Sequence, residues 1–188
     1  MRIAIVFLAA ALGGAWAQDI KLPASFDKLA AKASESVDVN LNSNMLQFAG
    51  KFLSDKDADQ AQAKRIVGGL KGIRVRTLEF ANTGEYSMAD VDAVREQLKA
   101  PEWSRVVGVN SKKDGENTEV YFKASEGAQI GGIVVISAEP KELTIVNLSG
   151  SISVDDLTAL GGQFGIPKVG VPKAKSKDKD KNKDRDEE

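Results

Sequence analysis

The sequence WSRVVGVNSKKDGENTEVYFKASEGAQIGGIVVISAEPKELTIVNL, residues 103–148, decides the fold. It holds four β-rich runs separated by short polar turns. Asp114-Gly115 lies between the first two runs, and this pair is typical of a type I′ hairpin turn, whose central residues need positive φ. Residues 125–127 form the next turn, and Pro140 suits position i+1 of the last. Short connections pair neighbouring strands in antiparallel fashion, so we predict a four-stranded meander.

Two of these runs carry apolar side chains on both sides of the strand. Residues 133–136 are four consecutive β-branched side chains, and residues 143–148 are nearly as continuous. A strand with one solvent-exposed face would alternate apolar and polar side chains instead. We therefore expect both strands to be central or covered on both faces, with Gly131 and Gly132 marking a bulge or a close backbone approach.

Residues 73–80 form a further β-rich run in which charged and apolar side chains fall on the same side of the strand. Arg74 and Arg76 alternate in line with Leu78 and Phe80. Either a bulge near residue 77 exchanges the two faces, or the two arginines lie at an exposed end of a strand that is buried on both sides.

Three helices are predicted before this strand, over residues 23–33, 44–53 and 57–70. Asp57 and Gln60 resemble a capping box at the start of the third helix. Residues 34–41 alternate apolar and polar side chains between the first two helices. This run is a short edge strand or a bend.

The second of these helices carries a stripe of large apolar side chains. Met45, Phe48, Ala49 and Phe52 recur at helical spacing, with Leu53 beside them. Such a stripe is usually buried, so we predict that it belongs to the core. The alternative is a groove for a ligand or partner.

Two more helices are predicted further along the chain. Ser87 and Asp90 form a capping-box start, and the helix that follows directs Val91, Val94 and Leu98 inward. The residues expected on the buried side of a last helix, which starts at Ser153, are Leu157, Leu160 and Phe164.

These elements predict a single α+β domain over residues 18–165. We expect an antiparallel sheet of about five strands, with the four-stranded meander in its C-terminal half and helices mainly on one face. The chain of 188 residues is long enough for one such domain with a core of its own.

The composition restricts the chemistry. Lysine and arginine number 26 and aspartate and glutamate 27, so the charge balance does not favour a nucleic-acid partner. Cysteine and histidine are absent. Zinc sites built from these residues, thiol nucleophiles and Ser-His hydrolase arrangements are therefore excluded. We expect no metal, no cofactor and no catalytic residues.

The first 17 residues have the features of an export signal. Arg2 is followed by the apolar run 3–12, which is too short to span a bilayer, and by Ala15-Trp16-Ala17. We predict cleavage between Ala17 and Gln18, which leaves a periplasmic or extracellular protein with no transmembrane segment. An uncleaved anchor is the alternative.

Residues 166–188 are predicted to be a disordered charged tail. From residue 173 onward the tail is dominated by lysine and aspartate and then ends in acidic residues. Such a sequence cannot offset its ordering entropy by apolar burial. It is a solubilising tail or an electrostatic tether to an anionic surface.

One group of residues suggests a ligand- or partner-binding site. Arg74, Arg76 and Arg105 lie on predicted strands, with Trp103 and Glu79 nearby in sequence. Arginine forks on a sheet face bind carboxylate or phosphate groups. The alternative is that they pair across strands with acidic side chains. The candidate acids for this pairing are Glu79, Glu119 and Glu139.

The sequence resembles a bacterial family of exported proteins. The matching runs are MLQFA (45–49), GLKGIRVR (69–76), WSRVVGV (103–109) and AEPKELTIVN (138–147). They are similar to the domain of unknown function 4252 (DUF4252) family over residues 22–165. The resemblance implies an exported, often envelope-associated protein without an assigned activity, and a role in envelope sensing.

We therefore expect a non-catalytic protein that binds another envelope component or takes part in envelope sensing. One alternative is a small-ligand carrier or an enzyme that uses Arg74, Arg76 and Arg105 as one cluster. Another is a homo-oligomer formed through the sheet face.

Overall fold

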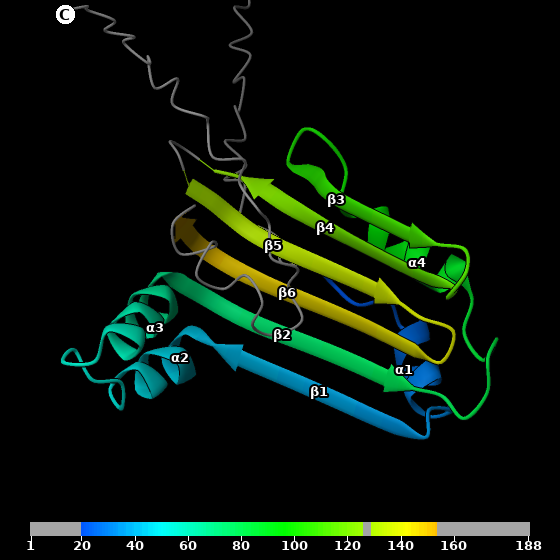
Figure 1. The fold of residues 1–188 in the computed structure, drawn as a ribbon, viewed down its shortest axis with the longest axis horizontal. Coiled ribbons are helices and arrows are strands. Elements are labelled where there is room, and N and C mark those ends of the chain that lie inside the picture. Colours follow the sequence, from blue (N-terminus) through cyan, green and yellow to red (C-terminus); the bar gives the residue numbers. More distant parts are fainter. Residues whose placement is uncertain (1–19, 126–128, 154–188) are drawn as a thin grey trace, which may run out of the picture.

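The computed structural model describes residues 20–125 and 129–153. These residues form one six-stranded antiparallel sheet in the order β1-β2-β6-β5-β4-β3, together with helices α1 to α4 (Figure 1). The predicted α+β class is confirmed. The strands are β1 (Glu35–Asn42), β2 (Leu70–Glu79), β3 (Trp103–Ser111), β4 (Glu116–Ala124), β5 (Gln129–Ala138) and β6 (Glu142–Ser153), and the helices are α1 (Ser25–Ala30), α2 (Ser43–Gly50), α3 (Ala58–Gly69) and α4 (Met88–Arg95).

Several predicted segments lie outside the described residues. They are the signal peptide with its cleavage site between residues 17 and 18, most of the turn at 125–127, the last helix after Ser153, and the tail 166–188. Within the described ranges, no helix is long and apolar enough to cross a membrane.

The predicted meander is confirmed, since β3, β4, β5 and β6 are neighbours in the sheet. The type I′ turn is wrong. Ser111 pairs with Glu116, so four residues form the loop, and the Ser111 hydroxyl hydrogen-bonds to the Asp114 carboxylate over 2.7 Å. Gly115 has φ of 74°, and a Cβ there would come within 2.9 Å of Pro140 Cγ. The longer loop therefore still needs glycine at this position.

The two doubly apolar strands, β5 and β6, occupy the centre of the sheet as predicted. The predicted bulge also forms, because the register between β5 and β6 shifts between Ile130 and Gly132. Side chains on both faces of β5 are buried, since Ile133 and Val134, which point to opposite faces, are each 0% exposed.

The ambiguous run after α1 is an edge strand. β1 pairs with β2 along its whole length, from Glu35 opposite Glu79 to Asn42 opposite Gly72. The register of β2 against β6 shifts between Leu70 and Gly72 and is regular afterwards. No bulge at residue 77 exchanges the faces, so the arginines of β2 lie on the same side as Leu78.

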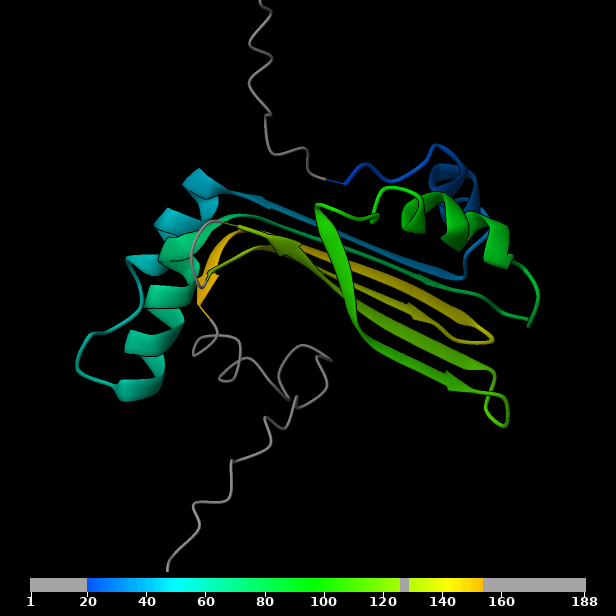
Figure 2. The same ribbon diagram turned by 90° about the horizontal axis from the view of Figure 1, so that it is seen from above.

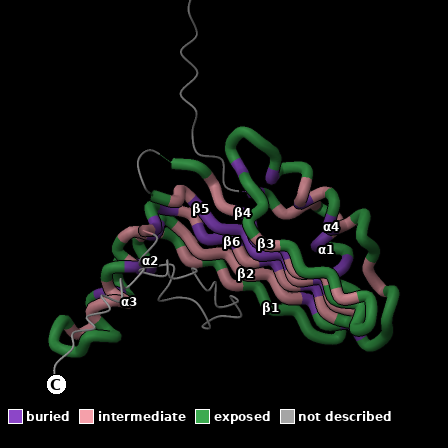
Figure 3. Tube along the Cα trace, turned by 45° about the horizontal axis from the view of Figure 1, so that its top comes forward, coloured by how far each residue is buried: buried purple, intermediate pink, exposed green. Residues whose placement is uncertain are grey.

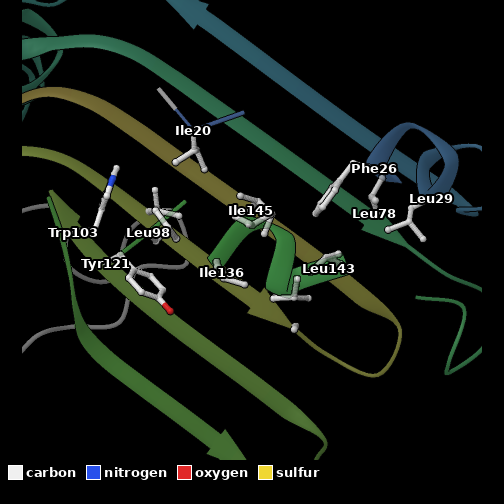
Figure 4. Packing of buried hydrophobic residues seen from close by; sticks show 14 of the residues in the cluster. Ile20, Phe26, Leu29, Leu78, Leu98, Trp103, Tyr121, Ile136, Leu143 and Ile145 are labelled. Atoms are coloured by element: carbon white, nitrogen blue, oxygen red, sulfur yellow. The ribbon is translucent and has the colours of Figure 1, made fainter. Parts of the chain in front are cut away.

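The sheet has two apolar faces. Face 1 lies under α1 and α4, and Figure 2 shows these two helices on one side of the sheet and α2 and α3 at its end. Figure 4 shows the face 1 side chains converging with those of the helices. The strand residues of face 1 include Leu78, Tyr121, Val134, Ile136, Leu143 and Ile145. The strand residues of face 2 include Val107, Val120, Phe122, Ile133, Val135, Val146 and Leu148.

The predicted helix starts are confirmed at α3 and α4. The Asp57 side chain accepts a hydrogen bond from the Gln60 amide at 2.9 Å. Ser87 and Asp90 form the capping box of α4. Each cap satisfies amide groups that the first helical turn leaves without an intrahelical partner.

The predicted burial of the stripe formed by Met45, Phe48 and Phe52 is wrong. Met45 is 50% exposed, Phe48 61% and Phe52 74%. Leu46, which is 2% exposed, faces the sheet instead. The helix leaves β1 at the end of the sheet, so only one side of it meets the core, and Figure 3 shows exposed segments along α2.

Candidate functional site

The three arginines of the predicted site do not lie together. Arg74 and Arg76 are on β2, whereas Arg105 is on β3 at the far edge. Strands β6, β5 and β4 lie between them. At about 4.8 Å between neighbouring strands, this places the two groups roughly 19 Å apart. One ligand headgroup cannot bridge that distance.

The β2 arginines are engaged by neighbouring elements. Arg74 Nη1 donates to the main-chain oxygen of Ile20 at 3.2 Å. Arg76 Nη2 lies 3.0 Å from the carboxylate of Asp38, its cross-strand neighbour on β1, and 3.5 Å from that of Asp27 on α1. The buried Arg76 Nε has no hydrogen-bond partner among the described residues. These contacts tie β1 and α1 to the sheet.

Arg105 belongs to an ion-pair cluster around Glu119. The Glu119 side chain is 7% exposed, and its carboxylate accepts hydrogen bonds from Arg95 Nε at 2.8 Å and Arg105 Nη1 at 3.1 Å. The Tyr121 hydroxyl donates to the same carboxylate at 2.9 Å. Arg95 also pairs with Asp92 at 2.7 Å. The sequence analysis left two roles open for Arg105, ligand binding or pairing with an acidic side chain. The structure shows pairing with Glu119.

The charges of this cluster support one another. Burial raises the pKa of Glu119, but hydrogen bonds from Arg95 and Tyr121 and the positive charge of Arg95 outweigh it, so the pKa is lowered. Burial lowers the pKa of Arg95, and its bonds to Asp92 and Glu119 raise it above the usual value. Both carboxylate oxygens are occupied. The cluster fixes α4 to β4.

The sequence-based site did not include Arg95 or Tyr121. One signal was available, because Glu119 and Tyr121 are two residues apart on one strand and must share a face. The position of Arg95 over that face depends on how α4 packs, which its own sequence pattern does not determine.

The remaining predicted site residues also have structural contacts. Trp103 is 5% exposed within the face 1 core, and the Lys123 ammonium lies 5.7 Å from its ring centroid. Glu79 is exposed at the end of β2, and its main-chain oxygen accepts hydrogen bonds from Ser34. Glu79 on β2 and Trp103 on β3 are separated by β6, β5 and β4.

A shallow cleft of about 360 Å³ lies beside Tyr86, between the β3–β4 loop and the β5–β6 turn. The Tyr86 hydroxyl donates to the main-chain oxygen of Glu139. Burial, with the charges of Glu139 and Glu142, raises the pKa of Tyr86 to about 12. Burial and the charges of Glu142 and Glu116 also raise the pKa of Glu139. Among the described residues, no three metal-ligating side chains come together, here or elsewhere.

Among the described residues, one surface feature that lacks a structural explanation is the apolar stripe on α2 and the turn after it. Met45, Phe48 and Phe52 follow the spacing i, i+3, i+7, and the two phenylalanine rings pack edge to face with centroids 5.1 Å apart. More than half of each phenylalanine is exposed, at 61% and 74%. An aromatic pair of this kind, exposed on a helix and the turn that follows it, is typical of an interaction site. We call these three side chains the α2 stripe.

A family assignment agrees with the resemblance seen in the sequence. Residues 30–160, more than half of the chain, match the family model described as Domain of unknown function (DUF4252). The chain belongs to the DUF4252 family. No curated protein and no solved structure matches this DUF4252 chain. The family description carries no activity, so the function has to be inferred from the geometry.

Proposed function

We propose that this DUF4252 protein is an exported, non-catalytic binding protein of the bacterial envelope. It recognises another envelope protein by placing the α2 stripe in an apolar groove of that partner. The observation that carries the proposal is the exposure of Phe48 and Phe52, at 61% and 74%.

The spacing of the stripe supports a helix-in-groove mode of binding. Amphipathic helices that dock into grooves present anchors at i, i+3, i+4 and i+7. Fully burying one phenylalanine contributes roughly 1.5–3 kcal/mol. Two such anchors, with Met45 as an adaptable third, give enough apolar contact for a specific complex.

The charged residues support a non-catalytic role. Arg76 and Arg105 are paired with Asp38 and Glu119 respectively, and Glu119 has three donors. The carrier or enzyme expected from one cluster of three arginines is not proposed, because Arg74 and Arg76 lie across the sheet from Arg105.

Export is proposed from the first 17 residues alone. Their order of one basic residue, an apolar run and Ala15-Trp16-Ala17 is that of a cleaved secretory signal. The partner is therefore sought in the periplasm or at the cell surface.

The test places a photo-crosslinking amino acid at Phe48 in the chain 18–188. Met88, which is 43% exposed and lies on α4, is the matched control position. In an envelope extract of the source bacterium, we expect one crosslinked protein from position 48 that is absent from position 88. The double variant Phe48→Ser/Phe52→Ser should weaken binding of the purified partner by at least about 10-fold.

Two outcomes would contradict the proposal. Identical products from positions 48 and 88 would mean nonspecific capture. A product that contains only a second copy of the chain would replace the partner by a homo-oligomer, which sedimentation of the purified protein then has to show.

A further inference from the structure

The two edge strands of the sheet differ in how well they are protected against pairing with another chain. Among the described strands, β1 and β3 form the two borders of the sheet (Figure 1). The register of β3 against β4 shifts between Arg105 and Val107, and such a bulge twists an edge away from a further strand. β1 pairs with β2 in unbroken register and contains neither lysine nor proline, the residues that commonly block an edge. The outer side of β1 is therefore the better template for pairing.

The side chains of β1 are polar on one face and apolar on the other. Asp38 lies opposite Arg76 on face 1, and Leu41 packs against the face 2 core. Successive side chains of a strand point to opposite faces. The residues on face 1 are therefore Ser36, Asp38, Asn40 and Asn42, and those on face 2 are Val37, Val39 and Leu41. A strand that pairs with β1 has to match both rows.

We propose that β1 pairs with β1 of a second copy of this chain, antiparallel, with Val39 opposite Val39 on a two-fold axis. An axis perpendicular to the sheet keeps face 1 of both copies on one side, so polar side chains meet polar ones and apolar meet apolar. Residues 36–42 of both copies then pair. The further pairs across the axis are Val37 with Leu41, Asp38 with Asn40, and Ser36 with Asn42.

The charges of β1 select this register. Arg76 binds Asp38 through Oδ2 at 3.0 Å, so Oδ1 remains to accept a hydrogen bond from the Asn40 amide of the second copy. A shift of two residues in one direction places Asp38 opposite Asp38, and like charges directly opposite each other destabilise a strand pair. A shift in the other direction pairs only residues 38–42. Glu35, the other acidic residue of the strand, lies beyond the paired segment.

The pairing closes on itself. Each copy uses the same strand, so the contact is isologous and the assembly stops at two copies. Both borders of the joined sheet are then formed by β3, the strand with the bulge. No residue of α2 takes part, so this inference does not depend on the partner site proposed above.

The first experiment uses the absence of cysteine from the chain. Val39→Cys and, as its control, Val37→Cys are made singly in the chain 18–188 and oxidised mildly. Two residues 39 are directly opposite each other, within the Cα separation that a disulfide spans. Two residues 37 are about 14 Å apart, because each lies opposite residue 41. We expect a covalent dimer from Val39→Cys alone, although Val37 is the more exposed of the two, at 40%.

The control also decides against random collision. Random encounters would oxidise the exposed position 37 at least as fast as position 39. A dimer from Val37→Cys as abundant as that from Val39→Cys, or no dimer from Val39→Cys, overturns the proposal.

The second experiment leaves the strand without cysteine. Sedimentation of the chain 18–188 over a range of concentrations should show a monomer–dimer equilibrium. Asn40→Asp places a carboxylate opposite Asp38 at both symmetric positions and should raise the dissociation constant by at least roughly 10-fold, less so in high salt. Residue 40 lies opposite Arg74 within its own chain, so the new carboxylate is compatible with the fold, which thermal unfolding checks.

Asn110→Asp, at an exposed position of β3, is the matched control and should leave the equilibrium unchanged. A protein that stays monomeric at every concentration overturns the proposal. A dimer that Asn40→Asp does not weaken, or that Asn110→Asp weakens equally, overturns it as well.

Discussion

Helices α2 and α4 carry the same apolar spacing and reach opposite outcomes. In α4 and the turn after it, Val91, Val94 and Leu98 are 0%, 0% and 4% exposed. In α2 and the turn after it, the equivalent positions Met45, Phe48 and Phe52 are 50%, 61% and 74% exposed. The stripe with the larger side chains is the one left in solvent.

The difference lies in the polar contacts at the two ends of α4. Arg95 at its C-terminal end binds Glu119 of β4, and Tyr86 just before its start binds the main chain at Glu139. These contacts hold the helix over face 1. Helix α2 is capped locally by Asn42 and contacts the core through Leu46, on its other side. In α4 the stripe is the side that faces the sheet, whereas in α2 the side that faces the sheet is that of Leu46.

The largest expected effect breaks the covered stripe. Leu98→Ala should lower the free energy of unfolding by about 2–5 kcal/mol, since it leaves a cavity in the face 1 core beside the end of α4. Urea denaturation of the chain 18–188 measures this loss. A loss below about 1 kcal/mol would show that the α4 stripe contributes as little as an exposed one.

The next largest loss of stability is expected from the ion pair of Glu119 with Arg95, at the C-terminal end of α4. Glu119→Gln should cost about 1.5–3 kcal/mol at neutral pH, because charge-assisted hydrogen bonds to Arg95 and Arg105 are lost. The folded-state pKa of Glu119 is lowered, so its contribution is present above the unfolded value of about 4.3 and is lost as the pH falls through the folded value. Unfolding curves at falling pH should therefore converge for the two proteins. Parallel curves would contradict this assignment.

A smaller loss of stability is expected from the hydrogen bond of Tyr86, just before α4. Tyr86→Phe removes the hydrogen bond to the main chain at Glu139 and should cost about 0.5–1.5 kcal/mol. The pKa of Tyr86 is raised to about 12. The wild-type protein should therefore lose stability between the unfolded value of about 10 and pH 12, because only the unfolded state ionises there. The variant should lack that part of the loss, as thermal unfolding in this pH range can show.

The smallest effect on stability is expected at the uncovered stripe. Phe52→Ala should change the free energy of unfolding by less than about 0.5 kcal/mol, since the ring is 74% exposed. The same denaturation measurement, run beside Leu98→Ala, sharpens the comparison between equivalent positions. A loss above 2 kcal/mol would place Phe52 in a core and remove the basis of the proposed partner site.

The sequence was sufficient for features that depend on neighbouring residues. The meander, the caps at Asp57 and Ser87, and the central position of β5 and β6 follow from turn chemistry and periodicity. The β3–β4 loop was the exception, because Ser111 binds the Asp114 side chain and closes a loop two residues longer than the Asp-Gly pair predicts.

Features that depend on strand order were beyond the sequence. Arg76 pairs with Asp38 because β1 and β2 align in one particular register, and no local pattern specifies that register. Arg105 is separated from Arg76 because β6, β5 and β4 insert between their strands. The prediction of one arginine cluster required β2 and β3 to be neighbours in the sheet, and they are not.

The pairing of β2 with β6 has a consequence for the order in which the sheet can be completed. A ribosome makes β1 and β2 early, yet their neighbour toward the centre of the sheet is the last described strand. Two paired strands alone are marginally stable in water. The β1–β2 pair therefore has no neighbour toward the centre of the sheet until residues 142–150 are available. Completion of the sheet therefore depends on its last described strand, β6.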